Sequence, residues 1–172
     1  MGKKVLVLDT TLLVVWLRFP GENAVGPKDD LWTFDRIDQH FKESEQQGAT
    51  FVLPLATIIE TGNMICKCEQ HCRENLSKQL AEIIRKCASG DSPWALFSDQ
   101  SVLWTPAQLV ELAETWPSQI NYNRCHSLGD ATIKTVAEYY TKSGFAVEIA
   151  TGDAGLKYFQ YPQPQPSPRR RR

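Results

Sequence analysis

The sequence lacks the features that define several classes of protein. No window of its 172 residues approaches the length of a membrane span. Basic residues are not in excess, since 19 Lys and Arg face 20 Asp and Glu for a net charge of −1, whereas nucleic-acid-binding domains are typically basic. With 42% hydrophobic and 23% charged residues, the composition also argues against a disordered chain. The length suits one globular domain with a sizeable core.

Cysteine is scarce and irregularly spaced, which argues against a disulfide-stabilised secreted protein. The five cysteines are an odd number, so we expect reduced thiols and a cytoplasmic protein. The N-terminal segment also favours a cytoplasmic protein, because it does not match a signal peptide. Lys3 and Lys4 precede an apolar run like that of a signal peptide, but Asp9 interrupts the run and no small-residue cleavage site follows. The cysteines are Cys66, Cys68, Cys72, Cys87 and Cys125.

Residues 161–172 differ in composition from the rest of the chain. This segment is rich in proline and ends in four arginines, so we predict an extended or disordered tail after a single domain at residues 1–160. Without these arginines, 15 basic residues face 20 acids, and the rest of the chain carries −5. Such an acidic domain can still bind nucleic acid if metal ions neutralise part of its charge. The tail either contacts phosphates non-specifically or takes no part.

Apolar runs alternate with amphipathic patterns, which indicates an α/β fold. The run at 5–8 is apolar on both faces, as in a strand buried inside a parallel sheet. Strands separated by helices form βαβ units, so we predict a three-layer α/β/α sandwich with a central parallel sheet. The other predicted strands are 50–54, 145–151 and a short one at 101–104; the predicted helices are about 11–18, 35–48, 54–67, 74–90, 105–116, 127–144 and 152–159, with a loop at 120–126.

Two acids follow strands of this sheet. Right-handed crossovers place the C-terminal ends of parallel strands at one edge, where open α/β sheets bind ligands. Asp9 follows the strand at 5–8, and Asp153 follows the strand at 145–151, so we expect both at that edge. An acid at a strand-to-helix junction is also a common N-cap or Asx turn, and this reading stays open for each.

Two further acids lie near the starts of predicted helices. Asp130 precedes Ile133 by one turn and so extends the core-facing stripe of its helix. It also completes a capping box with Ser127, and the two roles are compatible. Glu60 follows two isoleucines in the second turn of its helix, where it either faces the interior or reaches past Ile59 into solvent.

Together these four acids predict a metal site. Carboxylates are costly to bury side by side unless a cation joins them. Oxygen-only ligands select hard cations such as Mg²⁺ or Mn²⁺. Such a site positions a water and stabilises the charge that develops on a phosphodiester. The predicted catalytic residues and metal ligands are Asp9, Glu60, Asp130 and Asp153.

Four short motifs contain these acids: "VLVLDTTLL", "LATIIETGN", "SLGDATIKTVAEYY" and "EIATGD". This ordered set resembles that of the PIN-domain nucleases, and within them the VapC-type toxins of bacterial toxin–antitoxin pairs. The family's acidic quartet falls on the four acids. Thr10 matches a hydroxyl residue that often follows the first acid, and Thr151 one that precedes the last. The stretch between Asp9 and Glu60 is longer than in compact toxins of this type, and residues 89–104 match no part of the pattern.

The resemblance implies a PIN-like fold and an endoribonuclease that depends on Mg²⁺ or Mn²⁺. Its substrate would be single-stranded RNA, and its product would carry a 3′-hydroxyl. The resemblance also implies a homodimer and suggests an antitoxin protein that blocks the site.

Other interpretations stay open. A catalytically silent PIN-like module would bind RNA or protein and keep the acids as helix caps. A phosphatase would use Asp9 as its nucleophile, but we would then expect a second acid two residues later, and that position is Thr11. The stretch Cys66–Cys72 is a candidate zinc site, although its ligands would all lie on one helix. The simpler interpretation is that these thiols fill space in the core. His126, four residues before Asp130, is a candidate to contact substrate.

Overall fold

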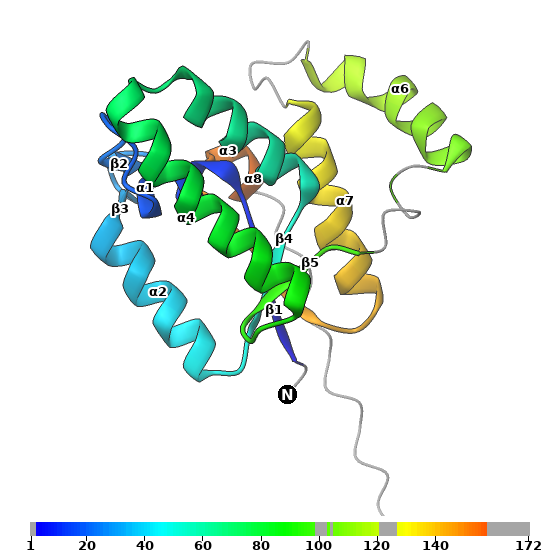
Figure 1. The fold of residues 1–172 in the computed structure, drawn as a ribbon. Coiled ribbons are helices and arrows are strands. Elements are labelled where there is room, and N and C mark those ends of the chain that lie inside the picture. The colour runs from blue at the N-terminus through cyan, green and yellow to red at the C-terminus, as the bar shows by residue number, and fades with distance from the viewer. Residues whose placement is uncertain (1–2, 99–102, 104, 121–126, 158–172) are drawn as a thin grey trace, which may run out of the picture.

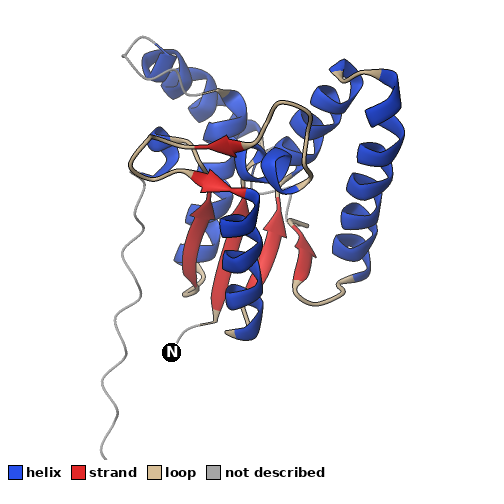
Figure 2. Cartoon of the chain, turned by 90° about the vertical axis from the view of Figure 1, so that its left-hand side faces the viewer, coloured by secondary structure: helices blue, strands red, loops and turns tan. Residues whose placement is uncertain are grey.

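A parallel β-sheet forms the centre of the protein. The computed structural model describes residues 3–98, 103, 105–120 and 127–157. Within these residues the sheet has four strands in the order β5-β4-β1-β6. Helices lie on both of its faces (Figures 1 and 2), so the predicted three-layer α/β/α sandwich is confirmed. The strands are β1 (Lys4–Leu8), β4 (Thr50–Leu53), β5 (Trp94–Leu96) and β6 (Ala146–Ala150).

Helices and a small hairpin connect these strands. The hairpin is antiparallel and pairs β2 (Ala24–Val25) with β3 (Trp32–Thr33). In the part of the chain that the structure describes, none of the helices is long and apolar enough to cross a membrane. The helices are α1 (Thr10–Trp16), α2 (Phe34–Gln46), α3 (Leu55–Lys67), α4 (Gln70–Ser89), α6 (Pro106–Ile120), α7 (Leu128–Lys142) and α8 (Ala154–Lys157).

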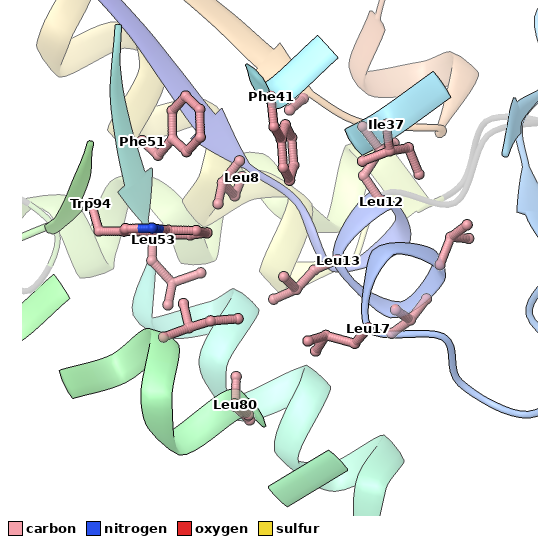
Figure 3. Packing of buried hydrophobic residues seen from close by; sticks show 14 of the residues in the cluster. Leu8, Leu12, Leu13, Leu17, Ile37, Phe41, Phe51, Leu53, Leu80 and Trp94 are labelled. Atoms are coloured by element: carbon pink, nitrogen blue, oxygen red, sulfur yellow. The ribbon is translucent and has the colours of Figure 1, made fainter. Parts of the chain in front are cut away.

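Strand β1 lies between β4 and β6, and it is buried on both faces because helices cover both sides of the sheet. Successive side chains of a strand point to opposite faces. Leu6 and Leu8 therefore join the core beneath α1, α2, α3 and α4, whereas Val5 and Val7 join a second core beneath α7. Figure 3 shows the packing around Leu8 in the first of these cores. Burial on both sides explains why the sequence of β1 is an unbroken apolar run.

Most of the predicted elements are confirmed, with small shifts at their ends. Helix α4 ends at Gly90, whose φ of +69° is a left-handed conformation that glycine adopts without strain. Helix α7 begins with the predicted capping box. Pro54, predicted in the first turn of its helix, instead precedes α3 as its N-cap residue.

The sequence patterns do not predict two of the elements. Strand β5 has three residues and pairs with β4, where Phe51 lies opposite Trp94. The hairpin of β2 and β3 occupies the long stretch between Asp9 and Glu60. Both elements are too short to carry a periodic pattern, so they form only through contacts with the rest of the fold.

Some predictions fall on residues that the structure does not describe. The strand predicted at 101–104 lies outside the described residues except for Leu103, which is helical. The loop predicted at 120–126 also lies outside them, apart from Ile120 at the end of α6. The same holds for the tail at 161–172.

Candidate carboxylate site

Asp9 is the most buried of the four predicted acids, with 2% of its surface exposed. It caps helix α1, because its Oδ1 accepts a hydrogen bond from the Thr10 backbone N–H (2.7 Å). Its Oδ2 accepts two more, from the hydroxyls of Thr11 (2.6 Å) and Thr151 (2.6 Å). Three donors therefore fix this carboxylate at the C-terminal end of β1.

The surroundings of Asp9 oppose its charge. Burial raises the pKa of its carboxyl above the ordinary value of 3.8, and the Asp130 carboxylate raises it further. The hydrogen bonds from the three threonines lower this pKa without cancelling the effect of burial. Among the described residues, none of the ion pairs includes Asp9 or any of the other three acids. Asp9 is thus an acid whose ionised form is destabilised and has no basic partner there.

Thr10 joins Glu60 to Asp9. Its backbone N–H donates to Asp9, and its hydroxyl donates to Glu60 Oε2 (2.8 Å). Thr10 is itself buried, at 7% exposure, whereas Glu60 is half-buried in the second turn of α3. The first residue of α1 therefore holds two acids that come from separate elements of the fold.

The start of α7 closely approaches Glu60. A Cβ added at Gly129 would overlap the Glu60 carboxylate, so a residue with a side chain here would displace that carboxylate from its present position. The next residue, Asp130, accepts a hydrogen bond at Oδ2 from the Ser127 N–H (2.7 Å), and its own N–H donates to the Ser127 hydroxyl (3.0 Å). The capping box predicted for Asp130 is confirmed, and its carboxylate also raises the pKa of Asp9.

Asp153 is tied to this network through its backbone. Its N–H donates to the Thr151 hydroxyl (2.9 Å), and the Gly152 N–H donates to the Thr11 hydroxyl (2.9 Å). The Asp153 carboxylate instead caps α8, where its Oδ1 accepts from the Leu156 N–H (2.9 Å). The residue is exposed to solvent.

The four acids lie around one edge of the sheet but do not form a preformed metal-binding site. Asp9 and Asp153 follow the adjacent parallel strands β1 and β6, as predicted. Glu60 approaches Gly129, the residue before Asp130. Within the described residues, however, no three Asp, Glu, His or Cys side chains are grouped closely enough to hold a metal ion. Each carboxylate accepts a hydrogen bond from a donor of its own.

The chemistry of these side chains nevertheless suits a divalent cation. Carboxylate oxygens are the ligands that Mg²⁺ and Mn²⁺ prefer. A cation beside Asp9 would also offset the burial and the repulsion from Asp130 that raise its pKa. The residues fit such an ion by donor type, but the carboxylates would have to move closer together to coordinate it jointly.

Two residues that shape the site are absent from the predicted set. The Thr11 hydroxyl links Asp9 to the Gly152 backbone, and Gly129 makes room for Glu60. The sequence carries a weak signal for each. Thr11 follows a capping acid by two residues, where its hydroxyl can reach that acid. Gly129 lies in the first turn of a helix, where glycine is unfavourable, and its presence there can indicate close packing.

The cysteines at the junction of α3 and α4 lie mostly against the core. Cys68 and Cys72 are half-buried and pack on the first core, as expected of thiols that fill core space. The Cys68 thiol also donates to the Met64 carbonyl (3.4 Å). Cys66 is exposed. The other candidate, His126, lies outside the described residues.

The fold and the acids define an α/β sandwich with four separately hydrogen-bonded carboxylates around the C-terminal edge of its parallel sheet. A scan against protein-family models and searches of curated proteins and of solved structures found no match to this chain. The resemblance to the PIN-domain nucleases therefore rests on the four sequence motifs.

Proposed function

We propose that this protein is a metal-dependent endoribonuclease of the PIN type that cleaves single-stranded RNA. The observation that carries this proposal is the state of Asp9. It is a buried carboxylate whose pKa is raised by burial and by Asp130, and no basic residue among those described is paired with either acid. A buried acid with a shifted pKa at the ligand-binding edge of a parallel sheet is typical of a functional site. The ordered set of motifs supports the same function.

In this proposal the four acids hold one or two Mg²⁺ or Mn²⁺ ions. When bound, the ion supplies an activated water for in-line attack on phosphorus and stabilises the charge that develops there. Thr11 and Thr151 hold the Asp9 carboxylate in one orientation, and Thr10 does the same for Glu60. The residues that would bind the ion are Asp9, Glu60, Asp130 and Asp153.

The biological setting follows from the same resemblance. We propose a homodimer that acts in the cytoplasm as the toxin of a toxin–antitoxin pair, with an antitoxin protein that blocks the carboxylate site. The RNA substrate reaches this edge of the sheet as a single strand.

A catalytically silent PIN-like module is the second candidate. It is favoured by the hydrogen-bond donor that each carboxylate already has and by the absence, in the described residues, of a group of three ligands. The acids would then act only as helix caps and hydrogen-bond acceptors. The phosphatase reading has less support, because Asp9 is 2% exposed and already accepts three hydrogen bonds, one of them from Thr11, where a second acid would be wanted.

The experiment that tests the proposal is cleavage of labelled single-stranded RNA with Mg²⁺, with Mn²⁺ and with EDTA. The nuclease cleaves only with metal. Glu60→Gln is the sharpest variant, because its amide oxygen can still accept from Thr10 while the negative charge is lost. We expect a loss of cleavage on the order of 100-fold. The control is Glu74→Gln, which removes an exposed acid of α4.

Three results decide between the candidates. Cleavage in EDTA, or undiminished cleavage by Glu60→Gln, would refute a metal-dependent nuclease with this site. RNA that binds but stays intact with every metal would favour the silent module. Wild-type protein should also gain thermal stability in Mn²⁺, by about 2.7 kcal/mol at a hundred times the dissociation constant.

A further inference from the structure

The hairpin segment, residues 24–33, lies beside the loop that carries Asp153. It belongs to the stretch that makes the interval between Asp9 and Glu60 long. Figure 2 shows its two short strands beyond the arrowheads of the sheet, at the same edge as the candidate site. The hairpin pairs with no strand of the sheet, so its role is not to extend the sheet.

The first contact of the hairpin segment is apolar and falls just before Asp153. A Cβ added at Gly152 would overlap the side chain of Val25, so the two are in close contact. Val25 is half-buried, and Gly152 is buried. Strand β2 therefore packs directly on the backbone that leads into Asp153.

The second contact is charged and falls just after Asp153. Lys157, the last residue of α8, forms an ion pair with Asp30. Asp30 also pairs with Arg36 of α2 (2.7 Å). Lys157 lies over the ring of Trp32, with Nζ 5.2 Å from the ring centroid, and Arg36 lies over the same ring at 4.1 Å. The hairpin segment thus holds α8 through both a charge and an aromatic ring.

We infer that the hairpin segment is a positioning element for Asp153, with Asp30 and Lys157 as its charged latch and Val25 as its apolar contact. Residues 152 and 157 bracket the acid, and each is held by the same short segment. The same loop is also held by α1 and by the residue that follows β6. The hydroxyl of Thr11 accepts a hydrogen bond from the Gly152 N–H, and the hydroxyl of Thr151 accepts one from the Asp153 N–H. Only the metal-binding consequence of this inference rests on the proposed function.

The latch is open to solvent, and this makes it sensitive to salt. The side chains of Lys157 and Asp30 are 26% and 38% exposed. Exposed charges are screened over about 10 Å at 0.1 M salt and over about 3 Å at 1 M. The hold on α8 should therefore weaken as ionic strength rises, whereas the buried hydrogen bonds of Asp9 should not.

The test is amide hydrogen exchange of the metal-free protein at Gly152, Asp153 and Leu156. We compare wild type with Lys157→Met, which removes the charge, and with Lys157→Arg, which keeps it. We expect about fivefold faster exchange in Lys157→Met, because an exposed ion pair contributes up to about 1 kcal/mol. We expect near-wild-type exchange in Lys157→Arg. High salt should accelerate exchange in wild type and leave Lys157→Met unchanged.

A second measurement follows the consequence for the site. Mn²⁺ binding, read from the loss of the free-ion electron paramagnetic resonance signal, should weaken about fivefold in Lys157→Met and recover in Lys157→Arg. The matched control is Lys78→Met, which breaks an exposed ion pair with Glu74 on α4 and should change neither measurement.

The two readouts separate the inference from the proposed function. If wild type fails to bind Mn²⁺, the proposed function is wrong, and the exchange data still decide the role of the latch. If exchange in the loop is the same in wild type and Lys157→Met, or if Lys157→Arg behaves like Lys157→Met, the positioning role is overturned. Asp30→Asn removes the same ion pair from the opposite partner together with the Asp30–Arg36 pair, so exchange should accelerate at least as much as in Lys157→Met.

Discussion

Replacing Thr11 by valine tests the network that joins the ends of β1 and β6. The Thr11 hydroxyl donates to Asp9 and accepts from the Gly152 N–H, so valine removes both bonds and keeps a similar shape. A hydrogen bond to a charged group contributes about 1.5–3 kcal/mol, and a buried N–H left unpaired costs about 1–3 kcal/mol. Because Thr11 is half-buried and water can reach part of it, we expect the free energy of unfolding to fall by about 2–3 kcal/mol at neutral pH.

This loss should depend on pH, because the Thr11 hydrogen bond lowers the pKa of Asp9. In the folded wild type this pKa is still above 3.8, so protonation favours the folded state, and stability falls as pH rises through the folded pKa. Without the hydroxyl the pKa rises further. The difference between wild type and variant should be smallest where Asp9 is protonated in both proteins, and largest above both pKa values.

Urea denaturation in EDTA, from about pH 4 to about pH 8, measures this difference. The control is Thr141→Val, because Thr141 is also half-buried and its hydroxyl donates only to a helix carbonyl, that of Ala137 (2.9 Å). We expect the control to change stability by less than about 0.5 kcal/mol at every pH. A loss in Thr11→Val that matches the control, or that is constant with pH, would refute the reasoning.

Two more variants test the approach to Glu60 and an ion pair elsewhere on the sheet. Gly129→Ala places a Cβ onto the Glu60 carboxylate, which is the flexible end of its side chain and can move aside, so the variant should lower RNA cleavage while thermal stability changes by less than about 1 kcal/mol, whereas Gly62→Ala, with open space at its Cβ, should leave cleavage unchanged. Burial raises the pKa of Glu148. Its neighbours His40 of α2 and Lys4 of β1, each 2.9 Å from the carboxylate, outweigh burial and lower this pKa below 4.5. Its contribution to stability is therefore present above that pH and lost as pH falls through the folded pKa. Glu148→Gln should flatten the acid side of the stability curve, and an unchanged curve would contradict this.

Local signals explain which parts of the fold the sequence predicts. The apolar runs of β1 and β4 and the capping box of Ser127 and Asp130 depend on neighbouring residues only, and the structure confirms them. Strand β5 is different. It has three residues and forms a strand by pairing with β4, so its stability comes from a contact that its own sequence does not encode.

In the candidate site, too, the sequence predicts local features but not contacts between distant residues. The positions of the acids follow from strand ends and helix starts, which are local features. Their partners do not, because the Thr11 hydroxyl meets the N–H of Gly152 only after β1 and β6 have paired. Helix caps and metal sites also use the same residue types at the same places. The sequence pattern therefore predicts where Asp9 lies but not whether its carboxylate serves as a cap, a ligand or both.

The order of the strands has a consequence for the protein during its own synthesis. Asp9 and its partner Thr151 are 142 residues apart, so the ribosome makes β1 long before β6. Until β6 arrives, one edge of β1 is open, and open strand edges pair readily with other chains. Asp9 also lacks one of its hydroxyl donors over that interval. If the proposed function is correct, the carboxylate site therefore stays incomplete beside the messenger and ribosomal RNA during synthesis, and it is completed only after residues 146–153 have been translated.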